Sequence, residues 1–241
     1  MGNNTVFALW PYIAIAVLVA GTLFRYLLVL RQPLALAAAM EEAKTIFKGR
    51  LFWTSIFVLL AGHIVALLFP RAILSWNSNT AGLYILEGLA LAAGLVSVAG
   101  SAILIWRHLG RSNRSLATAL LDTVFLAAIF AVLLSGVLTA VFYRWGSSWG
   151  TITLAPYVAS LVRGQPVVTL AAQMPALVRL HVLATFVAIA LLPLTRLSAF
   201  LIVAMHGCTV LIMRPFRAAG DAITEWTNKH NPGNRFWPEE D

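Results

Sequence analysis

Charged side chains are scarce in this sequence, and acidic ones are scarcer than basic ones. Of 241 residues, 11% are charged and 60% are hydrophobic, with 9 Asp and Glu against 17 Lys and Arg. The mean hydropathy is +0.85. A chain of this length has too little polar side chain to cover a soluble globule, so the composition indicates an integral membrane protein.

Cysteine is almost absent, because Cys208 is the only one in the sequence. A single cysteine excludes an intramolecular disulfide and any cluster held by several cysteines. The net charge of +8 does not indicate nucleic-acid binding, since the basic residues are spread over short loops without an aromatic and basic platform. The N-terminus lacks a basic region before its apolar segment and a small-residue cleavage site after it, so we expect this helix to be retained.

Five apolar segments are long enough to cross a bilayer as helices: about 6–30, 51–70, 83–106, 116–143 and 176–203. Eleven basic residues fall on one side of such a bundle: Arg31, Lys44, Lys48, Arg50, Arg107, Arg111, Arg114, Arg214, Arg217, Lys229 and Arg235. The other side has Arg71, Arg144 and Arg163, with Arg179 at its edge. The positive-inside rule therefore predicts an all-α bundle of five transmembrane helices, with the N-terminus outside and the C-terminus cytoplasmic. The outer segment 144–175, rich in Gly, Ser, Trp and Pro, is predicted to form an ordered interfacial cap.

His63 is the single ionisable side chain within the second apolar segment, and an imidazole there is costly unless it faces the bundle interior and has a partner. In the predicted topology His63 lies about 10 Å below the outer end of its helix. His181 lies at a similar depth in the fifth segment, which runs the other way. Two histidines at matched depth on different helices favour the two axial ligands of a haem iron. Gly62, beside His63, leaves space for a flat macrocycle.

Alternatives to haem remain open for these two histidines. Each can instead be satisfied by a neighbouring hydroxyl or carbonyl group. A zinc site needs a third or fourth ligand at the same depth, where only Glu87 is near. A second haem between His108 and His206 is disfavoured, because His206 lies 25 residues after His181 and so about 37 Å further along a helix.

Several short motifs resemble one known family, the gamma or cytochrome b subunit of membrane-bound respiratory nitrate reductase. They are Pro11-Tyr12-Ile13-Ala14, Arg25-Tyr26, Gly62-His63, Asp122 and Arg179-Leu180-His181. The resemblance implies a five-helix protein that passes electrons from membrane quinol, through two b haems, to iron–sulfur and molybdenum catalytic subunits on the cytoplasmic side. By position, His63 and His181 match the ligands of the outer haem.

The departures from this family pattern change the expected cofactors. Trp53 and Ala199 stand where the family has its two inner-haem histidines, so the resemblance implies one haem b instead of two. Trp53 is large enough to fill part of the vacated volume beside the small Ala199. The start of the third segment lacks the family's quinol-associated lysine, which makes Glu87 the candidate at a bound quinone or quinol. The alternative for Glu87 is a carboxylate paired with Arg71 or Arg179.

Three further expectations concern charge and the end of the chain. Arg179 is the nearest candidate for a haem propionate, with an arginine reaching the membrane interface as the alternative. Asp122 and Arg196 lie at one depth and are predicted to pair. Pro193 is expected to bend a continuous fifth helix, which overruns the inner boundary along 204–213 and is covered there by a partner protein.

These observations predict the haem b subunit of a quinone-linked respiratory oxidoreductase in a prokaryotic plasma membrane. Residues 1–213 form the transmembrane cytochrome b domain, and residues 214–241 form a cytoplasmic tail that contacts partner subunits. The catalytic centre is expected on another chain, among iron–sulfur and molybdenum subunits. A structural membrane anchor or assembly subunit is the main alternative, and a small membrane transporter is a further one.

Overall fold

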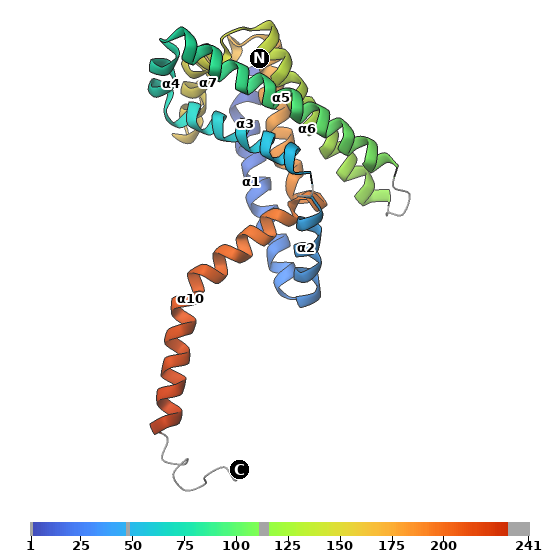
Figure 1. The fold of residues 1–241 in the computed structure, drawn as a ribbon, viewed down its shortest axis with the longest axis vertical. Helices are drawn as coiled ribbons and strands as arrows, with labels where there is room; N and C mark the ends of the chain where they lie inside the picture. The colour runs from blue at the N-terminus through green and yellow to red at the C-terminus, as the bar shows by residue number, and fades with distance from the viewer. Residues whose placement is uncertain (1, 47–48, 111–115, 231–241) are drawn as a thin grey trace.

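The computed structural model is built from helices and describes residues 2–46, 49–110 and 116–230 (Figure 1). Within these ranges no strand occurs. Lys48, Arg111, Arg114 and Arg235, which entered the charge bias, lie outside the described residues. The elements in chain order are α1 (Gly2–Leu30), α2 (Pro33–Ile46), α3 (Arg50–Leu68), α4 (Pro70–Asn77), α5 (Thr80–Leu109), α6 (Leu116–Phe142), α7 (Gly146–Val162), α8 (Val168–Ala172), α9 (Ala176–Leu191), the 3-10 turns η1 (Leu192–Leu194) and η2 (Arg196–Ser198), and α10 (Ala199–His230).

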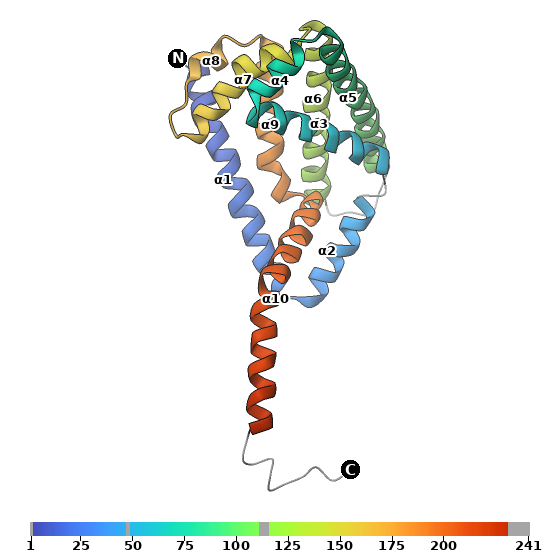
Figure 2. The same cartoon turned by 60° about the vertical axis from the view of Figure 1, so that its left-hand side comes forward.

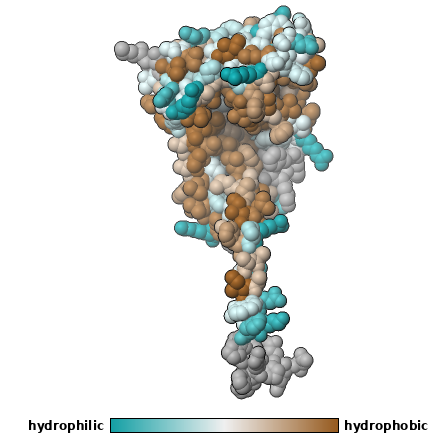
Figure 3. All heavy atoms as spheres, turned by 90° about the vertical axis from the view of Figure 1, so that its left-hand side faces the viewer, coloured by the Kyte–Doolittle hydropathy of each residue, from teal (hydrophilic) through white to brown (hydrophobic). Residues whose placement is uncertain are grey.

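Six helices in the described ranges are long and apolar enough to cross a membrane: α1, α3, α5, α6, α9 with η1, and the segment from η2 through α10. On the face drawn in Figure 3, hydrophobic side chains cover the middle of the molecule. Hydrophilic side chains gather at the N-terminal end and again where α10 leaves the bundle. A hydrophobic band between two polar zones is typical of a multi-pass membrane protein.

The predicted continuous fifth helix is divided in the structure, and this division gives six long apolar helices where the sequence predicted five spans. The helix ends at Leu191, passes through two 3-10 turns around an extended Thr195 (φ −106°, ψ 165°), and resumes at Ala199. Pro193 explains the break, since a proline inside a helix removes one backbone donor and clashes with the preceding turn. Figures 1 and 2 show α10 continuing toward the C-terminal end rather than turning back.

The bundle is held by long helix pairs, among which α6 packs against α9 and α5, and α3 packs against α5. A buried hydrogen bond of 2.7 Å joins the Ser55 and Ser97 hydroxyls across the α3 and α5 contact. Interhelical hydrogen bonds between small polar residues are a common way to fix helix pairs in a bilayer. The pair orients α3, which carries His63, against the rest of the bundle.

The predicted interfacial cap forms α7 and α8 at the N-terminal end of the molecule (Figure 2). Two tyrosine hydroxyls connect α7 to α1, because Tyr12 donates to the carbonyl of Leu161 and Tyr157 donates to that of Phe7, each at 2.8 Å. Burial, with a smaller contribution from Tyr12, raises the pKa of Tyr157 to about 12. The cap is therefore a fixed part of the bundle and covers the start of α9, near His181.

The second half of α10 extends away from the bundle along the long axis of the molecule (Figure 1). Every residue from 211 to 230 is exposed. The large apolar side chains among them are Leu211, Ile212, Met213, Phe216, Ile223 and Trp226. This stretch therefore presents exposed apolar surface beyond the bundle.

Candidate functional site

His63 on α3 and His181 on α9 face each other, although 118 positions separate them in the sequence. Their ring centres are 6.2 Å apart and their planes are inclined by 31°. Imidazole nitrogens bind transition metals at about 2 Å, which separates the ring centres of two trans ligands by about 6 Å. The two rings thus have the spacing of a pair that shares one metal ion between them.

Each ring is held by a hydrogen bond on one nitrogen only. His63 Nδ1 lies 2.7 Å from the carbonyl oxygen of Leu59, and His181 Nδ1 lies 2.9 Å from that of Val132. A carbonyl only accepts, so Nδ1 carries the proton in the neutral rings and the lone pair lies on Nε2. Carbonyl contacts of this kind fix the tautomer of metal-binding histidines. The Ser135 hydroxyl, 3.2 Å from His181 Nδ1, adds to the support.

Two glycines shape the space around the rings. A Cβ atom at Gly136 would lie 3.0 Å from His181 Cε1, so α6 approaches the ring closely only because this position has no side chain. A Cβ atom at Gly62 would meet nothing within 4 Å, and His63 itself is exposed. Open space therefore lies next to Gly62 on α3.

A metal site made of protein side chains alone does not fit this pair. Among the described residues, no group of three or more His, Cys, Asp or Glu side chains is placed to hold a metal ion. Zinc requires three or four such ligands. A porphyrin supplies four nitrogens of its own and needs only the two axial imidazoles, so the residues present fit haem better than a bare metal.

Arg179 and Glu87, the other two residues predicted near these histidines, differ in their contacts. Arg179 is half-buried, and its Nε is a buried donor without a hydrogen-bond partner. Glu87 Oε1 accepts hydrogen bonds from the Ser147 backbone N–H (2.8 Å) and hydroxyl (2.6 Å) at the start of α7. Glu87 thus connects α5 to the cap, and the alternative partners Arg71 and Arg179 are replaced by Ser147.

Trp53 and Ala199, the two residues predicted to mark vacated inner-haem positions, lie among packed side chains. The Trp53 ring lies 6.4 Å from that of Phe200, the neighbour of Ala199 in sequence. Ala199 is 2% exposed and belongs to a buried cluster with Tyr26, Ala39 and Ile202. The start of α3 therefore meets the start of α10 through aromatic contact.

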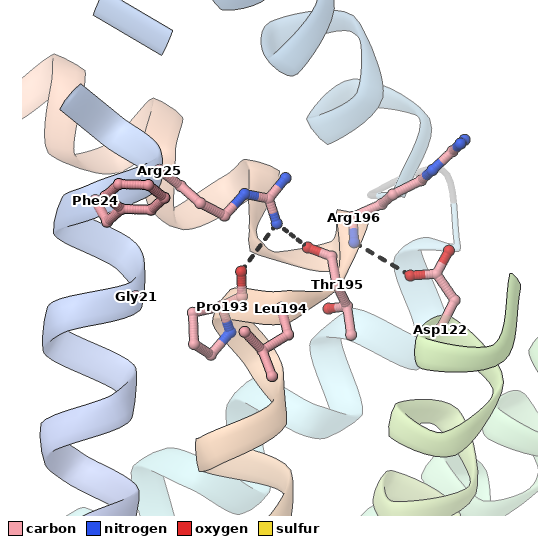
Figure 4. Close-up of a pocket in the computed structure, with 8 residues that line it drawn as sticks. All are labelled: Gly21, Phe24, Arg25, Asp122, Pro193, Leu194, Thr195 and Arg196. Carbon is pink, nitrogen blue, oxygen red and sulfur yellow. Dashed lines mark hydrogen bonds between the residues drawn. The ribbon is translucent and has the colours of Figure 1, made fainter. Parts of the chain in front are cut away.

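Asp122 and Arg196 do come together, but in a different way from the predicted side-chain pair. Asp122 Oδ1 accepts a hydrogen bond of 3.2 Å from the backbone N–H of Arg196. Figure 4 shows the Arg196 guanidinium directed away from this carboxylate. The reason is the helix break, because the exposed N–H groups at the start of η2 need an acceptor and an acidic group suits the positive end of a helix.

Arg25 on α1 provides hydrogen-bond donors at the same break, where Asp122 provides an acceptor. Its Nη1 donates to the carbonyl oxygens of Pro193 (3.0 Å) and Thr195 and to the hydroxyl of Ser198 (2.6 Å), as Figure 4 shows in part. A cation thereby covers the carbonyl end of the broken helix. A cavity of about 300 Å³ lies beside these groups, lined by Gly21, Phe24, Arg25, Asp122, Pro193, Leu194, Thr195 and Arg196.

Comparison with known proteins gives a consistent result over nearly the whole chain. A profile of the family described as nitrate reductase gamma subunit matches residues 3–216. The nitrate reductase gamma chain of Bacillus subtilis (strain 168) is 25% identical over 203 residues, which cover 82% of this chain and 90% of that protein. The chain belongs to the nitrate reductase gamma subunit family. The resemblance drawn from the motifs is thus confirmed.

Membership in this family has a direct consequence for the assembly. A gamma subunit is one membrane component of a larger complex with catalytic and other subunits, so this chain does not act alone. The exposed apolar helix surface of α10 agrees with that assembly.

Sequence reasoning missed the contribution of α6 to the histidine pair. Ser135 and Gly136 both contact His181, yet neither was a candidate. A signal was present, because a serine and a glycine stand together directly after the apolar run 124–134. Small residues at such positions mark close approach between membrane helices.

Proposed function

We propose that His63 and His181 bind one haem b as its two axial ligands. The observation that carries this proposal is the facing pair of rings, whose centres are 6.2 Å apart. The Nδ1–H of each ring donates a hydrogen bond to a backbone carbonyl. When bound, the haem supplies one-electron transfer. The carbonyls of Leu59 and Val132 accept from Nδ1, which leaves both Nε2 lone pairs available to hold the iron, and Gly62 leaves open space on α3.

The proposed role is that of the haem b membrane subunit of a quinone-linked respiratory oxidoreductase in a prokaryotic plasma membrane. The chain passes electrons between membrane quinol or quinone and partner redox subunits, which carry the iron–sulfur and catalytic centres, molybdenum among them. A single haem is proposed, since Trp53 packs on Phe200 and Ala199 is buried where the family has its inner ligands.

Glu87 and the exposed part of α10 also have proposed roles in this function. Glu87 accepts a proton from quinol near the haem, through the carboxylate oxygen that Ser147 does not engage. The apolar stretch 204–213 of α10 docks a partner subunit, and the tail 214–241 extends this contact, with the exposed side chains of Leu211, Phe216 and Trp226 among them. Residues 231–241, the end of that tail, lie outside the described residues.

The experiment is a pyridine haemochromogen assay, with protein quantitation, on the purified full chain. We expect one haem per chain in the wild type and none after His181→Ala or His63→Ala. His206→Ala is the matched control, because this imidazole also lies in a long apolar helix. The centre of its ring lies 6.4 Å from the centre of the Tyr26 ring, instead of facing a second histidine. Absence of haem from the wild type would reject the proposal and favour a structural membrane anchor.

A further inference from the structure

The cavity at the junction between α9 and α10 combines charged side chains with an apolar lining. Its volume is about 300 Å³, and three charged residues are among those that line it: Arg25, Asp122 and Arg196. Figure 4 shows that they come from α1, from α6 and from the 3-10 turns between α9 and α10. Ligand pockets in proteins start at about this volume, so the cavity is large enough for a small polar head group.

The cavity lies about one hydrocarbon thickness away from the N-terminal end of the bundle. The span formed by α9 and η1 has 19 residues, from Ala176 to Leu194, and a helix of this length advances about 28 Å. On α6, Asp122 and Phe142 are 20 positions apart, which corresponds to about 30 Å. The hydrocarbon core of a bilayer is about 30 Å thick. The cavity therefore lies where the acyl chains of the leaflet opposite the N-terminus meet their polar head groups.

Arg25 and Arg196 retain hydrogen-bond donors that the described part of the chain does not use. Arg25 contacts the segment 193–198 through Nη1 alone, so its Nε and Nη2 retain three N–H groups. Arg196 is exposed, and within the described ranges it donates only through its backbone N–H, to Asp122. Figure 4 shows its guanidinium directed away from that carboxylate. Guanidinium groups at membrane depth require acceptors and a counter-charge.

The formal charges around the cavity favour an anion with a single charge. Two guanidinium groups and one carboxylate leave a net charge of +1 among the lining residues. A phosphodiester carries one negative charge, and its oxygens accept charge-assisted hydrogen bonds from guanidinium groups. Basic pockets between membrane helices are typical sites for the head groups of anionic lipids. A zwitterionic head group matches less well, because its ammonium group adds a second positive charge.

The apolar part of the lining indicates that the anion is attached to acyl chains. Phe24 and Leu194 line the cavity, and both side chains are exposed. Exposed apolar side chains at this depth are in contact with lipid, so the cavity opens onto the acyl chains. A phospholipid provides an anionic group and apolar chains in one molecule, whereas free phosphate provides only the anion.

We propose that this cavity binds the phosphate of an anionic phospholipid from the leaflet opposite the N-terminus. Arg196 and the unused N–H groups of Arg25 donate to the phosphate, and the acyl chains lie against Phe24 and Leu194. Such a lipid connects α1 to the start of η2 and so supports the junction at which the helix is broken. The proposal is independent of the proposed haem and quinone chemistry, because it uses other residues.

The test is lipid titration of the purified full chain in a neutral detergent, followed by native mass spectrometry that counts the lipids bound to each chain. The lipids are dioleoylphosphatidylglycerol, which is anionic, and dioleoylphosphatidylcholine, which is zwitterionic, and inorganic phosphate is the competitor. Arg196→Gln removes the charge and Arg196→Glu reverses it. Arg31→Gln and Arg31→Glu are the matched controls, because Arg31 is also exposed, lies just beyond the end of α1 and does not line the cavity.

We expect one phosphatidylglycerol per chain to bind more tightly than phosphatidylcholine, and millimolar phosphate should not displace it. Arg196→Gln should weaken its binding about tenfold, as the loss of a hydrogen bond to a charged group requires, and Arg196→Glu should weaken it further. Both Arg31 variants should bind as the wild type does. A phosphatidylglycerol with a photoreactive acyl chain should label Phe24 or Leu194, which locates the lipid directly.

Each of three results would overturn the proposal. Equal affinity for the two lipids in the wild type would show that the anionic head group is not recognised. Equal binding by the Arg196 and Arg31 variants would place the lipid elsewhere on the surface. Displacement of the lipid by phosphate alone would identify a site for the free anion. Haem content is measured separately and does not enter these comparisons, so failure of this proposal leaves the proposed function unaffected.

Discussion

Replacing Arg25 tests how the bundle keeps a broken helix at membrane depth. Its Nη1 donates to Pro193, Thr195 and Ser198, and these acceptors belong to a segment in which Thr195 is 1% and Ser198 0% exposed. Backbone groups without partners are costly there, because these acceptors are buried within the protein and away from water. We therefore expect Arg25→Gln to loosen the junction between α9 and α10.

The magnitude follows from the number of protons available. Nη1 carries two protons, so at most two of the three acceptors receive a full hydrogen bond. A hydrogen bond from a charged group contributes about 1.5–3 kcal/mol, whereas interhelical bonds in bilayers average about 0.6 kcal/mol. Between these limits, Arg25→Gln should lower the free energy of unfolding by about 2–4 kcal/mol. For a chain of this size the melting temperature should fall by about 5–15 °C.

The assay is thermal and denaturant unfolding of the purified full chain in detergent, followed by helical circular dichroism. Arg31→Gln is the control, because Arg31 is exposed just beyond the end of α1 and should change stability by less than about 0.5 kcal/mol. Arg25→Lys should fall between, since lysine keeps the charge without the planar fork. Equal stability of Arg25→Gln and Arg31→Gln would refute the reasoning.

Three other outcomes follow from the geometry. Glu87→Gln keeps an oxygen for the Ser147 N–H and hydroxyl, so the fold should survive while quinol-driven haem reduction slows at least tenfold; an unchanged rate rules out a proton-accepting role. Gly62→Ala should leave unfolding unaltered but reduce haem per chain, because the new methyl occupies open space beside His63, and full haem content would show that this space is not used. The pKa of Tyr157 is about 12 in the folded protein and about 10 in the unfolded chain. The contribution of the neutral Tyr157 hydroxyl to the free energy of unfolding is therefore complete below pH 10 and is lost as the pH rises to about 12. Denaturant titrations at several pH values should show this loss of stability in the wild type and not in Tyr157→Phe. An identical pH profile in the wild type and in Tyr157→Phe would contradict the assignment.

The sequence by itself determined the class of the protein, the position of most helices and the family. Apolar length is a local property, so the predicted segments 6–30, 83–106 and 116–143 agree with α1, α5 and α6 to within a few residues. Depth along a helix is also local, because each residue advances about 1.5 Å. This regularity is why His63 and His181 could be matched in height before any contact was known.

Rotation about each helix axis was decided only by the tertiary structure. These segments are apolar on all sides, so hydropathy does not tell which face meets a neighbour, and the choice depends on how small and polar residues fit across the interface. Sequence therefore left open that Ser135 and Gly136 contact His181, that Ser147 engages Glu87, and that Asp122 meets a backbone amide. The break before Ala199 was likewise undetermined, because its exposed backbone groups are satisfied by a side chain from another helix, Arg25, 168 positions from Pro193. A proline becomes a bend or a break according to whether such distant partners exist.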